Sequence, residues 1–179
     1  PGIVFEDMLV MGFSTSESST SHAGMIRAFS VHDGAEIWRF NSLPLTGGLG
    51  AETWEEGSLT LAGGANNWTG MTLDEARGML FIPTGSATPD FYGASRTGDN
   101  LFANSLIALD VGSGDYRWHY QTIRHDLWDR DLPSPPTLVQ LERDGVLIDG
   151  VALTTKSGHL FLFNRDTGES LYDIHEVDG

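Results

Sequence analysis

The sequence predicts an all-β protein in which antiparallel hairpins pack against one another as the blades of a propeller. Short strand-like runs alternate with turn residues along most of the 179 residues. No long window shows the apolar period of a helix, so we expect little helix. The third observation is an internal repeat in which glycine and tryptophan recur at fixed spacing.

The expected strands flank short turns that contain glycine. The turns lie at residues 32–34, 74–78, 112–114 and 157–158. We expect strands at residues 3–12, 25–30, 36–40, 79–84, 105–110, 116–121, 151–155 and 159–164.

The repeat has a small or apolar residue at its first position, glycine at its seventh and an aromatic residue at its eleventh. The three copies are Ala28/Gly34/Trp38, Ala108/Gly114/Trp118 and, more weakly, Leu162/Gly168/Tyr172. Glycine suits the left-handed turn, an Asp or Asn at position three can bond the turn backbone, and the aromatic ring can pack on the neighbouring unit. Fixed spacing in three copies favours propeller blades over a β-sandwich with similar hairpins.

The repeats begin 80 and 54 residues apart, which is longer than the roughly 40–45 residues of a compact blade. Long loops must fill the difference, and loops on a rigid scaffold often carry sites. We therefore expect functional residues in residues 41–67 and 86–104.

The composition excludes several classes of function. The net charge of -15, from 25 acidic and 10 basic residues, would repel nucleic acid and favours solubility. Cysteine is absent, which excludes disulfides and thiolate metal sites. No apolar run approaches the ~20 residues of a membrane helix, and no signal peptide is present. Because the chain begins and stops close to strand-like runs, we expect it to be a piece of a longer protein.

Several segments carry a resemblance to a known family. The repeat resembles the tryptophan-docking motif of the quinoprotein dehydrogenases, which bind pyrroloquinoline quinone (PQQ). The match continues through GGANNW (63–68), PTGSATPDFYG (83–93), GDNL (98–101), Asn104-Ser105 and HDLWD (125–129), of which the last is the most specific. The pairs and strings RG (77–78), DFYG (90–93) and DRDLP (129–133) are most similar to the membrane-bound quinoprotein glucose dehydrogenase branch.

The resemblance implies a fold and an activity. Residues 1–179 would form about three blades, near the second to fourth, of an eight-bladed propeller. The whole protein would be a periplasmic enzyme that oxidises an aldose or an alcohol with PQQ and Ca²⁺ or Mg²⁺. Its electrons would pass to ubiquinone or cytochrome c, and it would associate with the membrane through parts outside this chain.

The resemblance also assigns site residues. Asp129 matches the catalytic base, which also contacts the metal, and Glu17 matches a metal-ligating glutamate. Trp68 matches the ring that stacks under PQQ, and Lys156 matches the basic residue at the quinone oxygens. Ser14 falls where the family has a serine near the cofactor.

Taken singly, each of these residues has a simpler interpretation. An acidic residue in a loop, a tryptophan in a sheet and a lysine in a turn are each common. Only their occurrence together, in the order of the family's motifs, favours a functional site.

Ser86 departs from the family pattern. Many members have asparagine there as a metal ligand, and a serine hydroxyl is shorter and weaker, which puts the exact metal shell in doubt. Asp131 matches an acid that serves larger trivalent ions in some relatives, but we interpret it as a hydrated acid beside Arg130. His125 is expected to pack rather than to pair with Asp126.

A second function remains open at this point, namely a non-catalytic propeller scaffold of the outer-membrane assembly type. Such scaffolds share the docking repeat and bind no cofactor. They have no need for Glu17, Trp68, Asp129 and Lys156 together, and this combination favours the enzyme.

Overall fold

Antiparallel hairpins form most of the secondary structure in the computed structural model of the protein, which describes residues 2–55 and 57–175. The first sheet has the order β1-β2-β3-β4, with β1 (Ile3–Phe5), β2 (Met8–Met11), β3 (Met25–Ser30) and β4 (Glu36–Asn41). The second has the order β10-β9-β7-β6, with β6 (Thr72–Asp74), β7 (Met79–Pro83), β9 (Ser105–Asp110) and β10 (Tyr116–Gln121). The third has the order β11-β12-β13, with β11 (Thr137–Arg143), β12 (Val146–Thr154) and β13 (Leu160–Asn164).

Little helix is present, as predicted. Within the described residues, the loops that join the sheets contain the short 3-10 helix η1 (Ala51–Thr53), the single turn α1 (Ser58–Leu61) and a two-stranded pair of β5 (Gly63–Gly64) with β8 (Ala87–Thr88). None of the described helices has the length and apolar character needed to cross a lipid bilayer.

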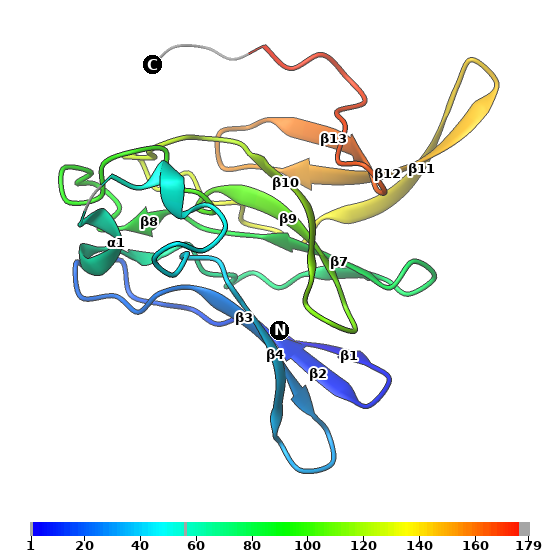
Figure 1. Ribbon diagram of the computed structural model, residues 1–179. Coiled ribbons are helices and arrows are strands. Elements are labelled where there is room, and N and C mark those ends of the chain that lie inside the picture. The colour runs from blue at the N-terminus through cyan, green and yellow to red at the C-terminus, as the bar shows by residue number, and fades with distance from the viewer. Residues whose placement is uncertain (1, 56, 176–179) are drawn as a thin grey trace.

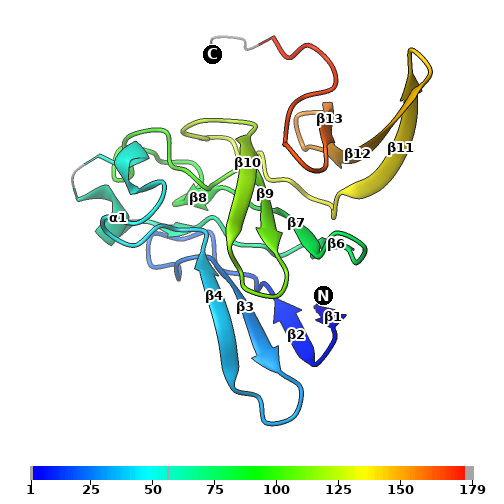
Figure 2. The ribbon, with the colours of Figure 1, turned by 45° about the vertical axis from the view of Figure 1, so that its right-hand side comes forward.

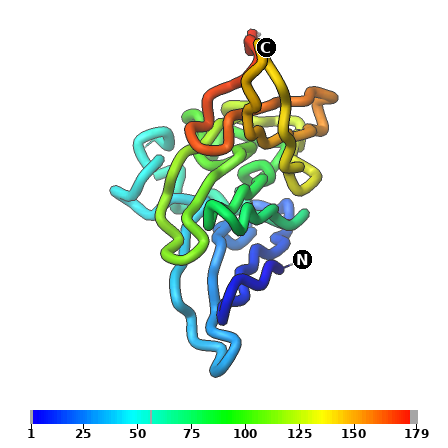
Figure 3. The backbone as a smooth tube through the Cα atoms, turned by 90° about the vertical axis from the view of Figure 1, so that its right-hand side faces the viewer, coloured from blue at the N-terminus to red at the C-terminus, as the bar shows by residue number. Residues whose placement is uncertain are grey.

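The three large sheets follow one another in chain order as open blades (Figures 1 and 2). The tube in Figure 3 shows the same succession from the N-terminal to the C-terminal sheet. The central sheet is buried on both faces. On β7, Leu80 and Ile82 pack toward the first sheet, whereas Met79 and Phe81 pack toward the third. This alternation explains why every residue of β7 is buried.

The tryptophan of each repeat contacts the hairpin turn of the next sheet. Trp38 Nε1 donates a hydrogen bond of 3.0 Å to the carbonyl oxygen of Val111, and Trp118 Nε1 donates one of 2.9 Å to that of Arg165. A Cβ atom at Gly114 would lie 2.6 Å from the Trp38 ring. Each of these two indole rings therefore lies directly against a glycine, and the predicted aromatic packing between blades is confirmed for the first two copies of the repeat. The aromatic residue of the third copy, Tyr172, is 61% exposed.

The residue at position three of each repeat holds its turn, also as predicted. Asp110 Oδ1 accepts hydrogen bonds from the backbone N–H groups of Gly112 and Ser113, at 3.0 and 3.1 Å. In the third copy, Asn164 Oδ1 accepts from Asp166 and Thr167. These turns present the glycine and the carbonyl group that receive the tryptophan.

Two of the expected strands differ in the structure, and four strands, β5, β6, β8 and β11, were not expected. Residues 3–12 form a hairpin rather than one run, because Glu6 takes a left-handed conformation (φ 50°) and turns the chain between β1 and β2. Residues 137–143 form the unexpected strand β11, and β12 begins at Val146 rather than at residue 151. The Asp144-Gly145 turn joins them with two positive φ angles, as is typical of a two-residue hairpin.

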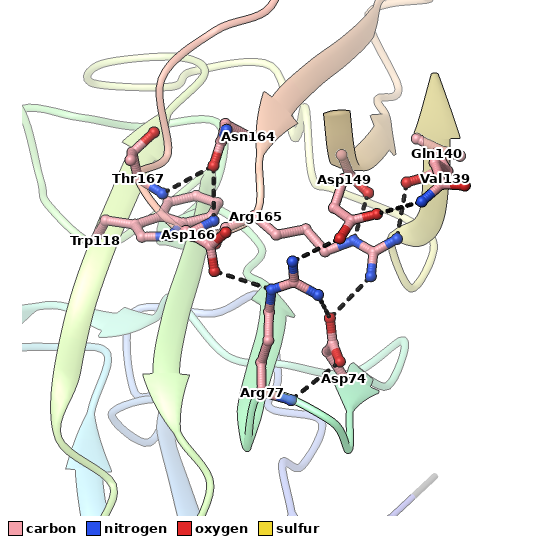
Figure 4. A network of polar contacts seen from close by, with 11 residues as sticks. Asp74, Arg77, Trp118, Val139, Gln140, Asp149, Asn164, Arg165, Asp166 and Thr167 are labelled. Atoms are coloured by element: carbon pink, nitrogen blue, oxygen red, sulfur yellow. Dashed lines mark hydrogen bonds and ion pairs between the residues drawn. The ribbon is translucent and has the colours of Figure 1, made fainter. Parts of the chain in front are cut away.

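Ion pairs around the buried Asp74 join the second and third sheets (Figure 4). Asp74, whose side chain is 5% exposed, accepts from Arg165 at 2.8 Å and from Arg77 at 3.1 Å. Arg77 also contacts Asp149 at 2.6 Å and Asp166 at 2.9 Å. Burial raises the pKa of Asp74, but the Arg165 hydrogen bond, the Arg77 backbone N–H and both arginine charges lower it further, so the net shift is downward.

We predict that Gly114→Ala destabilises the full-length protein by about 2–4 kcal/mol, since it adds a left-handed alanine and a clash with Trp38. The matched control is Gly34→Ala. Gly34 has a similar φ of 73° but nothing within 4 Å of an added Cβ, so only the conformational cost of about 1–2 kcal/mol applies. Thermal unfolding of both variants measures the difference, and equal losses would contradict the docking role of Gly114.

We predict that Asp74→Asn costs about 3 kcal/mol at neutral pH, because it leaves two half-buried guanidinium groups short of a partner. The exposed partner Asp166, replaced by Asn as a control, should cost less than ~1 kcal/mol. Because the folded-state pKa of Asp74 is below 3.8, its contribution is complete above that pH and disappears as pH falls through the folded value. Denaturant unfolding at pH 7 and pH 3 tests this, and a pH-independent difference would refute it.

Candidate functional site

Loops from all three sheets line a cavity of about 210 Å³. The lining includes Thr88 of β8, the strand at the left of Figure 1. The predicted site loops, residues 41–67 and 86–104, both contribute. The lining residues are Ser14, Thr15, Ser16, Glu17, Asn66, Trp68, Ser86, Thr88, Asp90, Asp131 and Lys156.

The structure brings the sequence-predicted residues together. Ser14, Glu17, Trp68, Ser86 and Lys156 all line this cavity. Asp129 is not a lining residue, but its Oδ1 atom lies 2.8 Å from Lys156 Nζ. All six residues therefore belong to one cluster, and the roles assigned to them stay predictions.

Asn66 joins the loop after β2 to the segment that carries Trp68. Its Oδ1 accepts from Thr15 Oγ1 at 2.8 Å and its Nδ2 donates to the carbonyl oxygen of Phe13 at 3.1 Å. These bonds connect residues more than 50 positions apart. They fix the loop that carries Ser14 and Glu17 against the segment that carries Trp68.

Asp131 lies at the centre of the cluster, and its interpretation as a hydrated acid was wrong. Its side chain is 14% exposed. One carboxylate oxygen accepts from Trp68 Nε1 at 3.0 Å and contacts Lys156 Nζ at 3.3 Å, while the other accepts from the Ser86 backbone N–H at 2.6 Å. A Cβ at Gly85 would approach this carboxylate to 2.7 Å, so glycine is required there. Asp131 thus orients the indole ring, and the sequence signals for it were its position two residues after Asp129 and its match to an acid in some relatives.

Lys156, in the turn between β12 and β13, brings its ammonium group to both acids of the preceding loop. Partial burial lowers its pKa, but the hydrogen bonds and charges of Asp129 and Asp131 raise it, with a net upward shift. Its Nζ also lies 5.9 Å from the centroid of the Trp68 ring, within reach of a cation–π contact. The cation therefore faces two carboxylates and an aromatic surface.

Asp129 has a left-handed backbone, with φ 52°. Aspartate tolerates this conformation better than most residues, and such positions cluster at functional sites. The side chain of Asp129 is 27% exposed, against 14% for that of Asp131. A carboxylate that is fixed but still accessible can take a proton from a small molecule.

Asp126 holds the loop that carries Asp129 and Asp131 in place through hydrogen bonds. It is buried, and its Oδ2 accepts from Ser86 Oγ, Asn104 Nδ2 and the Arg130 backbone N–H at 2.6, 2.8 and 2.6 Å. The hydroxyl proton of Ser86 is thus directed at Asp126, and the role of Ser86 as a metal ligand stays a prediction. His125 lies in the same loop, not in a strand, and packs against Gly98 and Gly93.

The charges of the cavity suit an anionic cofactor only together with a cation. The lining of the cavity contains three acidic side chains, Glu17, Asp90 and Asp131, and one basic side chain, Lys156. Among residues 2–55 and 57–175, no three acidic or imidazole groups converge closely enough to hold a metal by themselves. An ion there would need further oxygen ligands, which a carboxylate-bearing cofactor and water can provide. The half-exposed Trp68 ring offers a flat surface, so the residues present fit PQQ with a hard divalent ion.

A larger hollow of about 790 Å³ is lined by the end of β10, the loop that follows it and the start of β13. Of the six residues assigned to the site, none lines it. We therefore take the smaller cavity as the candidate site.

Comparison with known proteins agrees with this geometry. The family model for the β-propeller domain of PQQ-dependent glucose/ethanol/alcohol dehydrogenases matches residues 1–178. The quinoprotein glucose dehydrogenase of Gluconobacter oxydans (strain 621H) is 34% identical over 97% of this chain and 22% of its own length. That of Escherichia coli (strain K12) is 33% identical over 94% of this chain and 21% of its own length.

Solved structures show the same arrangement of sheets. The quinohemoprotein alcohol dehydrogenase of Comamonas testosteroni superposes with a TM-score of 0.86 at 26% identity, covering 99% of this chain and 28% of that chain. A europium-containing methanol dehydrogenase shares the fold with a TM-score of 0.86 at 22% identity, over 96% of this chain and 32% of that chain.

The chain spans about a fifth of the length of these curated relatives, and its open sheets form part of a propeller. The match over residues 1–178 shows that the chain belongs to the family of PQQ-dependent glucose/ethanol/alcohol dehydrogenase β-propeller domains.

Proposed function

We propose that this chain is part of a periplasmic PQQ-dependent dehydrogenase that oxidises an aldose or an alcohol and passes the electrons to ubiquinone or cytochrome c. The observation that carries the proposal is the convergence of Glu17, Trp68 and Lys156 on one cavity, with Asp129 bonded to Lys156. A cofactor-free scaffold would leave this cluster without a purpose. Relatives named for glucose, quinate and glycerol support small hydroxylated substrates.

Asp129 is the proposed base, because its exposed carboxylate can accept the proton of the substrate hydroxyl. PQQ, when bound, would supply the two-electron redox chemistry of the oxidation. A Ca²⁺ or Mg²⁺ ion held by Glu17, Asp129 and Ser86 would supply Lewis-acid polarisation. The assignments of PQQ and of the metal ion rest on the family to which the chain belongs.

The other residues orient and stabilise. Trp68, fixed by its bond to Asp131, provides the flat surface on which a planar ring stacks. Lys156 places positive charge beside that surface, where it stabilises negative charge that develops during the reaction. Ser14, at the rim of the cavity, can hydrogen-bond a cofactor carboxylate.

We predict that the full-length protein, stripped of cofactor and metal by a chelator, regains dye-linked oxidation of D-glucose or ethanol only when PQQ and Ca²⁺ or Mg²⁺ are both added. The acid-rich cavity provides one ammonium group against three carboxylates, so the anionic cofactor needs the cation. Dye reduction is the measurement, with PQQ alone and metal alone as controls. No stimulation by the pair, with any sugar or alcohol tried, would contradict the proposal.

We predict that Asp129→Asn lowers kcat by roughly 10²–10⁴-fold, because an amide cannot take the hydroxyl proton. The affinity for PQQ, followed by quenching of tryptophan fluorescence, should change less than about threefold. Asp144→Asn, in the exposed β11–β12 turn, is the matched control and should retain full activity. Wild-type turnover in Asp129→Asn would remove Asp129 from the role of base.

A further inference from the structure

Asp90 presents a buried carboxyl group, one oxygen of which lacks a hydrogen-bond partner among the described residues, in the candidate site. The residue is 4% exposed and lines the cavity together with Glu17, Trp68 and Asp131. Its Oδ1 atom has no hydrogen-bond partner within the part of the chain that the structure describes. Leaving a buried acceptor unpaired costs about 1–3 kcal/mol, and more for a charged group, so this carboxyl group is poised to receive a ligand.

The buried Arg96 side chain holds the loop that carries Asp90 in place. Arg96 is fully buried and donates to the carbonyl oxygens of Pro89, Asp90 and Asp126, and to Asn100 Oδ1. The guanidinium group thus fixes the backbone at Asp90 and leaves the carboxyl group unbonded. This arrangement pre-organises the carboxyl group toward the cavity.

The charges around Asp90 restrict the class of ligand that its carboxyl group can bind. Burial, and then the charges of Asp129, Asp131 and Glu17, raise the pKa of Asp90 to about 7, against the opposing effect of Arg96. An anion other than the cofactor would be repelled by Glu17 and Asp131, which line the same cavity. The cation of the proposed function is assigned to Glu17, Asp129 and Ser86, and among the described residues no three acidic side chains converge to hold a second one. An apolar ligand would leave the carboxyl group unpaired.

A hydroxyl group satisfies each of these conditions. It is neutral, it can donate to a carboxylate, and it can accept from a carboxylic acid. We propose that Asp90 binds a second hydroxyl of the substrate, one other than the hydroxyl that Asp129 deprotonates, and so selects polyhydroxylated substrates over monohydric alcohols. This inference rests on the proposed function and specifies its substrate class.

The test pairs a protein change with a substrate change. In the full-length holoenzyme loaded with PQQ and Ca²⁺, kcat/KM is measured for D-glucose and glycerol, for analogues of each that lack one hydroxyl, and for ethanol. Asp90→Leu removes both bonding atoms at similar size, and Asp90→Asn keeps a bonding group. Asp144→Asn serves as the control for an exposed acid.

We expect the best polyhydroxylated substrate to lose roughly 10–100-fold in kcat/KM with Asp90→Leu, the range for a hydrogen bond to a charged group. Wild type should lose about as much with one deoxy analogue, and Asp90→Leu should show no further loss with that analogue. Asp90→Asn should retain an intermediate rate. Equal losses for all substrates and analogues, or no loss, would overturn the inference.

Two outcomes separate this inference from the proposed function. A wild-type enzyme that oxidises ethanol as well as any polyhydroxylated compound overturns the role of Asp90 and leaves the dehydrogenase intact. A wild type that oxidises none of these compounds with PQQ and Ca²⁺ overturns both. PQQ and Ca²⁺ affinities, measured by fluorescence and calorimetry, should change less than about threefold in the Asp90 variants. A tenfold loss would assign Asp90 to the cofactor or the ion instead.

Discussion

The contact between each repeat tryptophan and the next hairpin turn is the interaction on which the rest of this structure depends. Trp38 and Trp118 each bond a backbone carbonyl group and lie against a glycine of the following sheet. One such contact fixes both the separation and the orientation of two sheets, because a directional hydrogen bond and a flat ring act together. The loops at the ends of the sheets therefore meet in a defined arrangement.

The candidate site exists only because three sheets are docked. Glu17 follows the first sheet's strand β2, Trp68 precedes the second sheet, and Lys156 lies in a turn of the third. Asp129 and Asp131 come from the loop that joins the second sheet to the third. No single blade holds a base, a cation and a stacking surface, so the stability of the docking contacts and the geometry of the site are coupled. The Asp74 ion pairs strengthen the same boundary.

The acidic residues in and beside the cavity fall into two groups according to the number of hydrogen-bond and ionic partners that they have. Asp126 and Asp131 each accept at least three hydrogen bonds or ionic contacts and hold loops and rings in place. Asp129 is more accessible, and Asp90 is buried with an unpaired oxygen. Carboxylates whose hydrogen-bonding capacity is filled hold the site in shape, whereas carboxylates with fewer partners can still bind a ligand.

The sequence by itself determined the all-β class, the repeat and the glycine turns, because strand and turn preferences depend on neighbours in the chain. Its family motifs also assembled six residues that the structure places in one cluster. Only the tertiary structure decided that residues 3–12 form a hairpin, that the Asp131 side chain is 14% exposed and hydrogen-bonded, and that Oδ1 of Asp90 lacks a partner among the described residues. The reason is physical: Asp131 meets Trp68 and Ser86 across 63 and 45 residues, and such pairings follow from how whole sheets pack.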